Sequence, residues 1–98
     1  MTAEDLMRSR YSAFVFENGV YLSQTWHPDT RPHHIRFDAE RTWTGLTVLS
    51  TQAGGPLDYE GVVEFWASFV RNERTGTVRE ESAFARLDGK WVYVQEKN

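Results

Sequence analysis

The sequence predicts an α+β domain in which two N-terminal helices pack on one face of a curved antiparallel sheet of about four strands. Apolar residues recur with helical spacing between Thr2 and Gly19. From Thr42 onward the pattern changes to segments rich in β-branched and aromatic residues, which are separated by turn sequences. With 98 residues, the chain is expected to form a single domain over 1–98.

The first helix is expected to begin at Thr2, because threonine is a good N-cap. Glu4 and Asp5 follow in the first turn, where carboxylates favour the positive end of the helix dipole. The helix is expected to end at Asn18 and Gly19, since both residue types tolerate the left-handed conformation that closes helices.

The segment VYLSQTW predicts a second, short helix that ends before Pro28, and Pro32 keeps the next loop extended. The stretch HHIRFDAE is compatible with either a short strand or a helical turn. Four strands are then expected in RTWTGLTVLSTQ, YEGVVEFWASFV, TVREESAFARL and KWVYV, with turns at AGGP, NERTG and Asp88-Gly89. The Asp-Gly pair favours a two-residue type I′ hairpin.

One side of the first helix is apolar, and Arg10 lies within it. The apolar side comprises Leu6, Met7, Tyr11, Ala13, Phe14 and Val15. In the third strand, alternation places Glu80 on the inner face with Val78 and Phe84. Because a buried charge without a partner is strongly disfavoured, Arg10 and Glu80 are predicted to form an ion pair. This pair would either fix the helix on the sheet or form the polar floor of a ligand cavity.

The second strand is expected to turn its uncharged residues toward the helices, namely Tyr59, Gly61, Val63, Phe65, Ala67 and Phe69. Trp66 then lies on the outer face with Val62 and Val70. An outer patch that holds a tryptophan suggests a partner surface, here a homodimer, although ordinary cross-strand packing would also account for it.

Composition excludes several classes of function. A formal net charge of −3 is unfavourable for nucleic-acid binding, which depends on lysine and arginine. The chain has no cysteine, so disulfides, thiol catalysis and cysteine-based zinc sites are excluded. No signal peptide or membrane span is evident, and a cytoplasmic protein without a cofactor or membrane partner is expected.

Several stretches resemble one known family: LMRSRYSAFV, YLSQTWHP, TWTGLTVL, the RTG turn and GKWVYV. They are similar to the central domain of the YchJ family of bacterial proteins of unknown function, and the resemblance covers nearly the whole chain. It implies a nuclear transport factor 2-like fold, in which a curved sheet wraps around helices and forms a cone with a pocket. Many relatives carry flanking cysteine-rich zinc segments of the SEC-C type, which this cysteine-free chain lacks.

His27 is a candidate general base, since histidine titrates near neutrality and related folds host lyases and isomerases. Its catalytic partner would be Glu80 or Tyr11. The alternative is that His27 hydrogen-bonds backbone at the end of the second helix. His33 and His34 follow closely, but adjacent histidines rarely point at one ion, so no metal site is predicted.

The candidate ligand-binding residues are Arg10, Tyr11, Trp26 and Glu80. They favour a non-catalytic module that binds a small molecule or a partner with a pocket in the cone. A small lyase or isomerase is the first alternative, and a structural adaptor that dimerises around Trp66 is the second. Fold alone cannot choose among them, because unrelated functions are built on the same fold.

Overall fold

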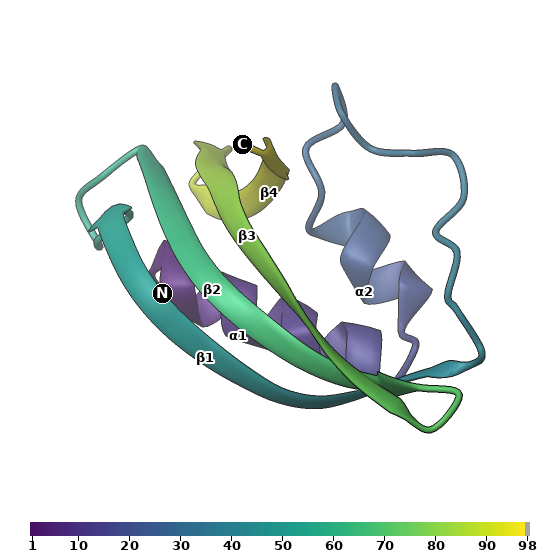
Figure 1. The fold of residues 1–98 in the computed structure, drawn as a ribbon. Helices are drawn as coiled ribbons and strands as arrows, with labels where there is room; N and C mark the ends of the chain where they lie inside the picture. Colours follow the sequence, from purple (N-terminus) through teal and green to yellow (C-terminus); the bar gives the residue numbers. More distant parts are fainter. Residues whose placement is uncertain (98) are drawn as a thin grey trace.

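The computed structural model describes residues 1–97, and Asn98, the last residue of the predicted domain, lies outside them. The elements are α1 (Ala3–Val15), α2 (Gly19–Gln24), β1 (Arg41–Ala53), β2 (Glu60–Arg71), β3 (Arg74–Leu87) and β4 (Lys90–Glu96). Consecutive strands pair antiparallel in the order β1-β2-β3-β4. Figure 1 shows the sheet curving around α1. The predicted α+β architecture is confirmed.

A capping box fixes the start of α1, as the sequence predicted. The Thr2 hydroxyl accepts a hydrogen bond from the Asp5 backbone N–H at 3.2 Å, and the Asp5 carboxylate accepts one from the Thr2 N–H at 3.0 Å. Two of the free N–H groups at the helix start are thereby satisfied. Helix α1 therefore begins at a defined residue.

The predicted end of this helix is wrong in detail. Glu17 adopts the left-handed conformation, with φ of 54°, rather than Asn18 or Gly19. The reason is that α2 begins immediately afterwards and needs an N-cap of its own. Asn18 fills this position, and its side chain accepts a hydrogen bond from the Tyr21 N–H at 3.1 Å.

The β2–β3 hairpin turn is shorter than NERTG predicted. It consists of Asn72 and Glu73 alone, with φ of 52° and 66°, so the strands continue further on both sides. Positive φ at both central residues is the requirement of a type I′ turn. Asp88 and Gly89 also have positive φ, at 52° and 81°, in agreement with the predicted hairpin. The HHIRFDAE stretch forms neither strand nor helix.

Two β-bulges bend β1. The pairing with β2 shifts between Trp43 and Gly45 and again between Val48 and Ser50, so that one residue of β1 is unmatched at each shift. Bulges of this kind increase local twist and bend the strand that carries them. Their positions account for the curvature that lets the sheet wrap around α1.

The core lies between α1 and the sheet and contains Ala3, Leu6, Met7, Val63, Phe84 and Trp91. Arg10 is buried in this helix face, as predicted, whereas Val15 was expected inside and is 41% exposed. Helical geometry turns about 100° per residue, so Val15 lies roughly 140° around the helix from Arg10. The buried stripe is thus centred on the arginine itself.

The predicted inner face of β2 is largely confirmed. Gly61, Val63 and Ala67 are buried, while Trp66 on the opposite phase is 45% exposed. Tyr59 is an exception, because it precedes the strand and is 78% exposed. Within residues 1–97, neither helix is long and apolar enough to cross a membrane.

Candidate functional site

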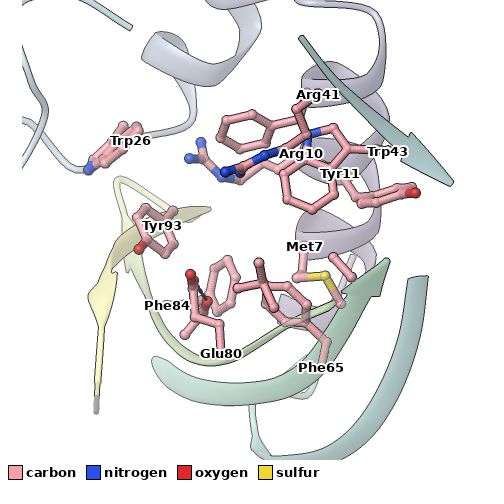
Figure 2. Close-up of a pocket in the computed structure, with 14 residues that line it drawn as sticks. Met7, Arg10, Tyr11, Trp26, Arg41, Trp43, Phe65, Glu80, Phe84 and Tyr93 are labelled. Atoms are coloured by element: carbon pink, nitrogen blue, oxygen red, sulfur yellow. Dashed lines mark hydrogen bonds between the residues drawn. The ribbon is translucent and has the colours of Figure 1, made fainter. Parts of the chain in front are cut away.

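A cavity of about 320 Å³ lies between α1 and the inner face of the sheet. It is lined by Met7, Arg10, Tyr11, Phe14, Trp26, Arg41, Trp43, Phe65, Ala67, Val78, Glu80, Ser82, Phe84 and Tyr93, and Figure 2 shows these side chains around it. Half of the lining residues carry aromatic rings, and only a few polar groups converge among them. This combination is typical of small-molecule sites, which occupy roughly 300–1,000 Å³.

Arg10 enters the cavity wall from the centre of the α1 stripe and is only 5% exposed. Its Nη1 donates to the Leu22 carbonyl at 2.8 Å and to the Thr25 hydroxyl at 2.7 Å. Its guanidinium carbon lies 4.9 Å from the ring centre of Trp26 and 4.7 Å from that of Tyr93. The arginine therefore joins α1 to the end of α2 and gives the Leu22 carbonyl a charged donor in addition to the Thr25 hydroxyl, which donates to it at 3.4 Å.

The predicted ion pair between Arg10 and Glu80 is not formed. Among residues 1–97, no ion pair within 4.0 Å joins these two side chains. In Figure 2, Glu80 lies near Phe84, across the cavity from Arg10. Alternation along β3 gave the correct face for Glu80 but not its distance from the helix. Arg10 instead uses neutral oxygens and ring faces, and burial lowers the pKa of Arg10 to about 10.

Glu80 accepts a hydrogen bond from the neighbouring Ser82 hydroxyl. Burial raises the pKa of the Glu80 carboxyl, and the nearby Glu96 adds to this effect, while Ser82 and Arg10 oppose it. Tyr93 faces the same space, and its burial, together with the charge of Glu80, raises the pKa of Tyr93 to about 12. The phenol of Tyr93 thus stays protonated at neutral pH.

Glu80→Gln is expected to increase the free energy of unfolding more at about pH 7 than at about pH 4. The raised pKa means that the folded state binds the Glu80 proton more tightly than the unfolded chain does. Protonated Glu80 therefore stabilises the folded state below the ordinary glutamate pKa of 4.5. This contribution to the free energy of unfolding is lost as the pH rises through the pKa that Glu80 has in the folded state. Urea denaturation at both pH values measures this, with exposed Glu60→Gln as the control. Equal effects of Glu80→Gln at both pH values would contradict it.

Arg41 lines the cavity although it is not among the residues predicted from the sequence. Its guanidinium carbon lies 5.1 Å from the ring centre of Trp43 and 4.7 Å from that of Phe69. Its Nε is buried without a hydrogen-bond partner among the described residues. The carboxylates at this end of the sheet, Asp38 and Glu40, are instead bound by Arg71 at 2.8 and 3.2 Å. The alternation of Arg41 with Trp43 at the start of β1 could have indicated their common face.

The charges in the cavity wall are unbalanced. Arg10 and Arg41 contribute two guanidinium groups, and no ion pair within residues 1–97 neutralises either of them. Glu80 is the carboxylate among the lining residues. The cavity wall is consequently positive, although the whole chain has a net charge of −3.

The structure does not bring His27 together with Glu80 and Tyr11. His27 is absent from the cavity wall, its Nδ1 accepts a hydrogen bond from the Asp29 N–H at 3.1 Å, and its backbone N–H donates to the Tyr93 carbonyl at 2.8 Å. These contacts match the backbone-binding alternative. His33 and His34 are exposed in the loop before β1, and in residues 1–97 no three His, Cys, Asp or Glu side chains form a metal-binding group.

All four predicted ligand-binding residues, Arg10, Tyr11, Trp26 and Glu80, line the cavity. Tyr11 packs edge-on against Trp43, and Trp26 against Tyr93, with ring centres 6.4 and 5.0 Å apart. The buried Nε1 of Trp26 has no hydrogen-bond partner in the described part of the chain, and Figure 2 shows it pointing away from the other labelled side chains.

The outer sheet face around Trp66 is largely polar. Trp66 pairs with Thr47 on one side and Arg79 on the other, and Arg79 binds Glu64 at 3.1 Å. The homodimer through this face stays a prediction.

The curved antiparallel sheet, the N-terminal helices packed against it and the cavity between them define the nuclear transport factor 2-like class of α+β domains. The family model described as "YchJ, middle NTF2-like domain" matches residues 2–96. The chain belongs to this family.

Two bacterial relatives show the similarity along most of the chain. The chain is 48% identical over 93 residues to a UPF0225 protein of Streptomyces avermitilis, covering 95% of this chain and 64% of that protein. It is 49% identical to a UPF0225 protein of Streptomyces coelicolor, covering 95% of this chain and 72% of that protein. The chain thus spans about two thirds of the length of these relatives.

Two solved structures are similar to this fold. One is the solution structure of a SEC-C motif containing protein from Rhodopseudomonas palustris, with a TM-score of 0.83 and 30% identity over 98% of this chain and 77% of that one. The other is a SEC-C motif containing protein from Psychrobacter arcticus, with a TM-score of 0.75 and 28% identity over 96% of this chain and 59% of that one. The cysteine ligands of such a motif are absent from this chain.

Proposed function

We propose that this domain is a non-catalytic binding module that holds a small, largely apolar molecule in the cavity between α1 and the sheet. The observation that carries the proposal is the cavity of about 320 Å³ with aromatic walls and few polar groups. Rings on several elements offer flat surfaces for an apolar body, and burial of such a body is favourable in proportion to the area removed from water.

The alternative of a lyase or isomerase has less support. Its base, His27, is held by the backbone outside the cavity wall. Glu80 is the titratable group that favours it, since a carboxylate with a raised pKa in a cavity can serve as a proton acceptor. Binding that survives Glu80→Gln would favour the module, and turnover lost in the same variant would favour the enzyme.

A neutral fluorescent probe, N-phenyl-1-naphthylamine, tests the proposal directly. Its fluorescence should rise saturably with the protein, and Val78→Phe, which fills the cavity, should weaken binding about tenfold or more. The matched control is Thr77→Phe, which places the same ring at the exposed neighbouring position of β3. Circular dichroism would verify that both variants fold. Equal binding by both variants, or no saturable binding by the parent, would reject a cavity-binding function.

A further inference from the structure

Two guanidinium groups line the cavity and no carboxylate of the described chain is bound to either of them. Arg41 carries a buried Nε with no hydrogen-bond partner in residues 1–97. Arg10 uses Nη1 for its two hydrogen bonds, to Leu22 and Thr25, and arginine has five N–H donors in all. A donor that is buried without a partner is costly, so the unpartnered Nε of Arg41 beside the cavity points to a ligand oxygen.

We infer that the cavity selects molecules with one carboxylate on a flat apolar body, and that Arg41, with Arg10, binds the carboxylate. This inference rests on the proposed binding function and adds the chemical class of the ligand. The planar guanidinium fork matches a carboxylate, and such charge-assisted hydrogen bonds are stronger than neutral ones.

The charge balance supports a single negative charge. Two guanidinium groups face one lining carboxylate, Glu80, while Asp38 and Glu96 act on Arg41 and Glu80 from outside the lining, and one additional anion in the cavity would reduce the positive excess of the wall. Glu80 lies across the cavity from Arg10 in Figure 2, beside Ser82 and Phe84, and leaves the side near the arginines open to another acid. A second negative charge on the ligand would face Glu80 and be repelled by it.

The aromatic side chains of the cavity wall would fix the orientation of the ligand's flat apolar part. Trp43 lies under the Arg41 guanidinium, and Figure 2 shows Phe65 and Phe84 on the other side of the cavity. A flat ring system between these side chains would place its acidic substituent at the Arg41 end. Burial of the ligand's apolar part would thus provide affinity, and the arginines would select ligands that carry a carboxylate.

Competition between two matched compounds tests the inference. Naphthalene-1-acetate and naphthalene-1-acetamide share one ring system and differ in charge, and each would be titrated against bound N-phenyl-1-naphthylamine. The acetate should displace the probe at a concentration about tenfold lower than the amide, the scale of one charge-assisted hydrogen bond. In Arg41→Met the ratio of the two affinities should fall to about one, because only the acetate loses a charge-assisted partner. The control, Arg79→Met, removes an arginine from the outer face and should keep the preference.

The outcomes separate the two proposals. One outcome is that Val78→Phe weakens binding of the probe, but the acetate and the amide displace the probe at equal concentrations. The carboxylate inference is then wrong and the binding function stands. If the probe does not bind, both proposals fail together. Because the comparison of acetate with amide uses the parent protein, it remains decisive even if Arg41→Met does not fold. An acetate preference that persists in a folded Arg41→Met protein would also overturn the assignment to Arg41.

Discussion

Arg10→Met is expected to lower the free energy of unfolding by about 2–4 kcal/mol. The change removes hydrogen bonds to the Leu22 carbonyl and the Thr25 hydroxyl and two cation–π contacts, with Trp26 and Tyr93. The Leu22 carbonyl lies in the last turn of α2 and would lose a charged donor in a buried place. Removal of a charge that is unfavourably buried offsets part of the loss. Urea denaturation at neutral pH measures the difference.

Double-mutant cycles measure which neighbouring side chains interact energetically with Arg10. Arg10→Met combined with Thr25→Val should show a coupling energy of about 1 kcal/mol, because the two side chains are in direct contact. Arg10→Met with Glu80→Gln should show a smaller coupling energy than the pair with Thr25, because no ion pair joins Arg10 and Glu80 and only their charges interact across the cavity. The exposed Arg8→Met is the control for loss of an arginine from the same helix. A large coupling with Glu80 and none with Thr25 would contradict the observed arrangement.

Gly61→Ala is expected to destabilise the domain by about 3 kcal/mol. A Cβ at residue 61 would lie 2.5 Å from the Cα and 2.9 Å from the N of Gly54, which are backbone atoms that no rotamer change can move. It would also approach the Cβ of Ala3 to 3.3 Å. These residues join the start of α1 to the β1–β2 hairpin, since the Ala3 N–H donates to the Gly54 carbonyl at 2.9 Å.

The matched control for this change is Gly45→Ala. It also adds a methyl group to a strand glycine, but nothing lies within 4 Å of the new atom. Its effect should stay within about 0.5 kcal/mol, because the added methyl group meets no neighbouring atom. Thermal or urea unfolding of both variants makes the comparison. Equal stability of the two variants would show that the hairpin separates from α1 at little cost.

The order and type of the elements could be predicted because each depends on local patterns. The capping residues at Thr2 and Asp5 and the turn at Asp88-Gly89 need only neighbours a few positions away. The predicted end of α1 was wrong because Asn18 can either close one helix or cap the start of the next. The sequence alone does not show that α2 uses it as an N-cap. Where two local signals conflict, as they do at Asn18, the element that follows determines which of them applies.

The site was predicted less completely, because it depends on distances between elements. Alternation placed Glu80 on the inner face, and helical spacing placed Arg10 toward it. Neither pattern gives the position along the strand, so the separation of the two side chains depends on how α1 lies on the sheet. Arg41 was missed because it stands at the start of β1, before the bulge that follows Trp43. This bulge changes which alternate residues face inward, so the pattern further along β1 does not indicate the face of Arg41. Positive charge in the wall follows from these two arginines and is invisible in an overall acidic composition.

The irregular ladder of β1 has a consequence for solution behaviour. Strand β1 has 13 residues and lies at one edge of the sheet, where a long, flat strand would invite a second chain to pair with it. Its bulges, after Trp43 and Val48, interrupt the regular spacing of donors and acceptors that such pairing needs. At the opposite edge, the backbone of Tyr93 in β4 is already bonded to Thr25 and His27 at 2.8 Å each. Both edges thus carry protection against intermolecular β-pairing, and the domain should resist aggregation at concentrations where an unprotected sheet of this length would form fibres.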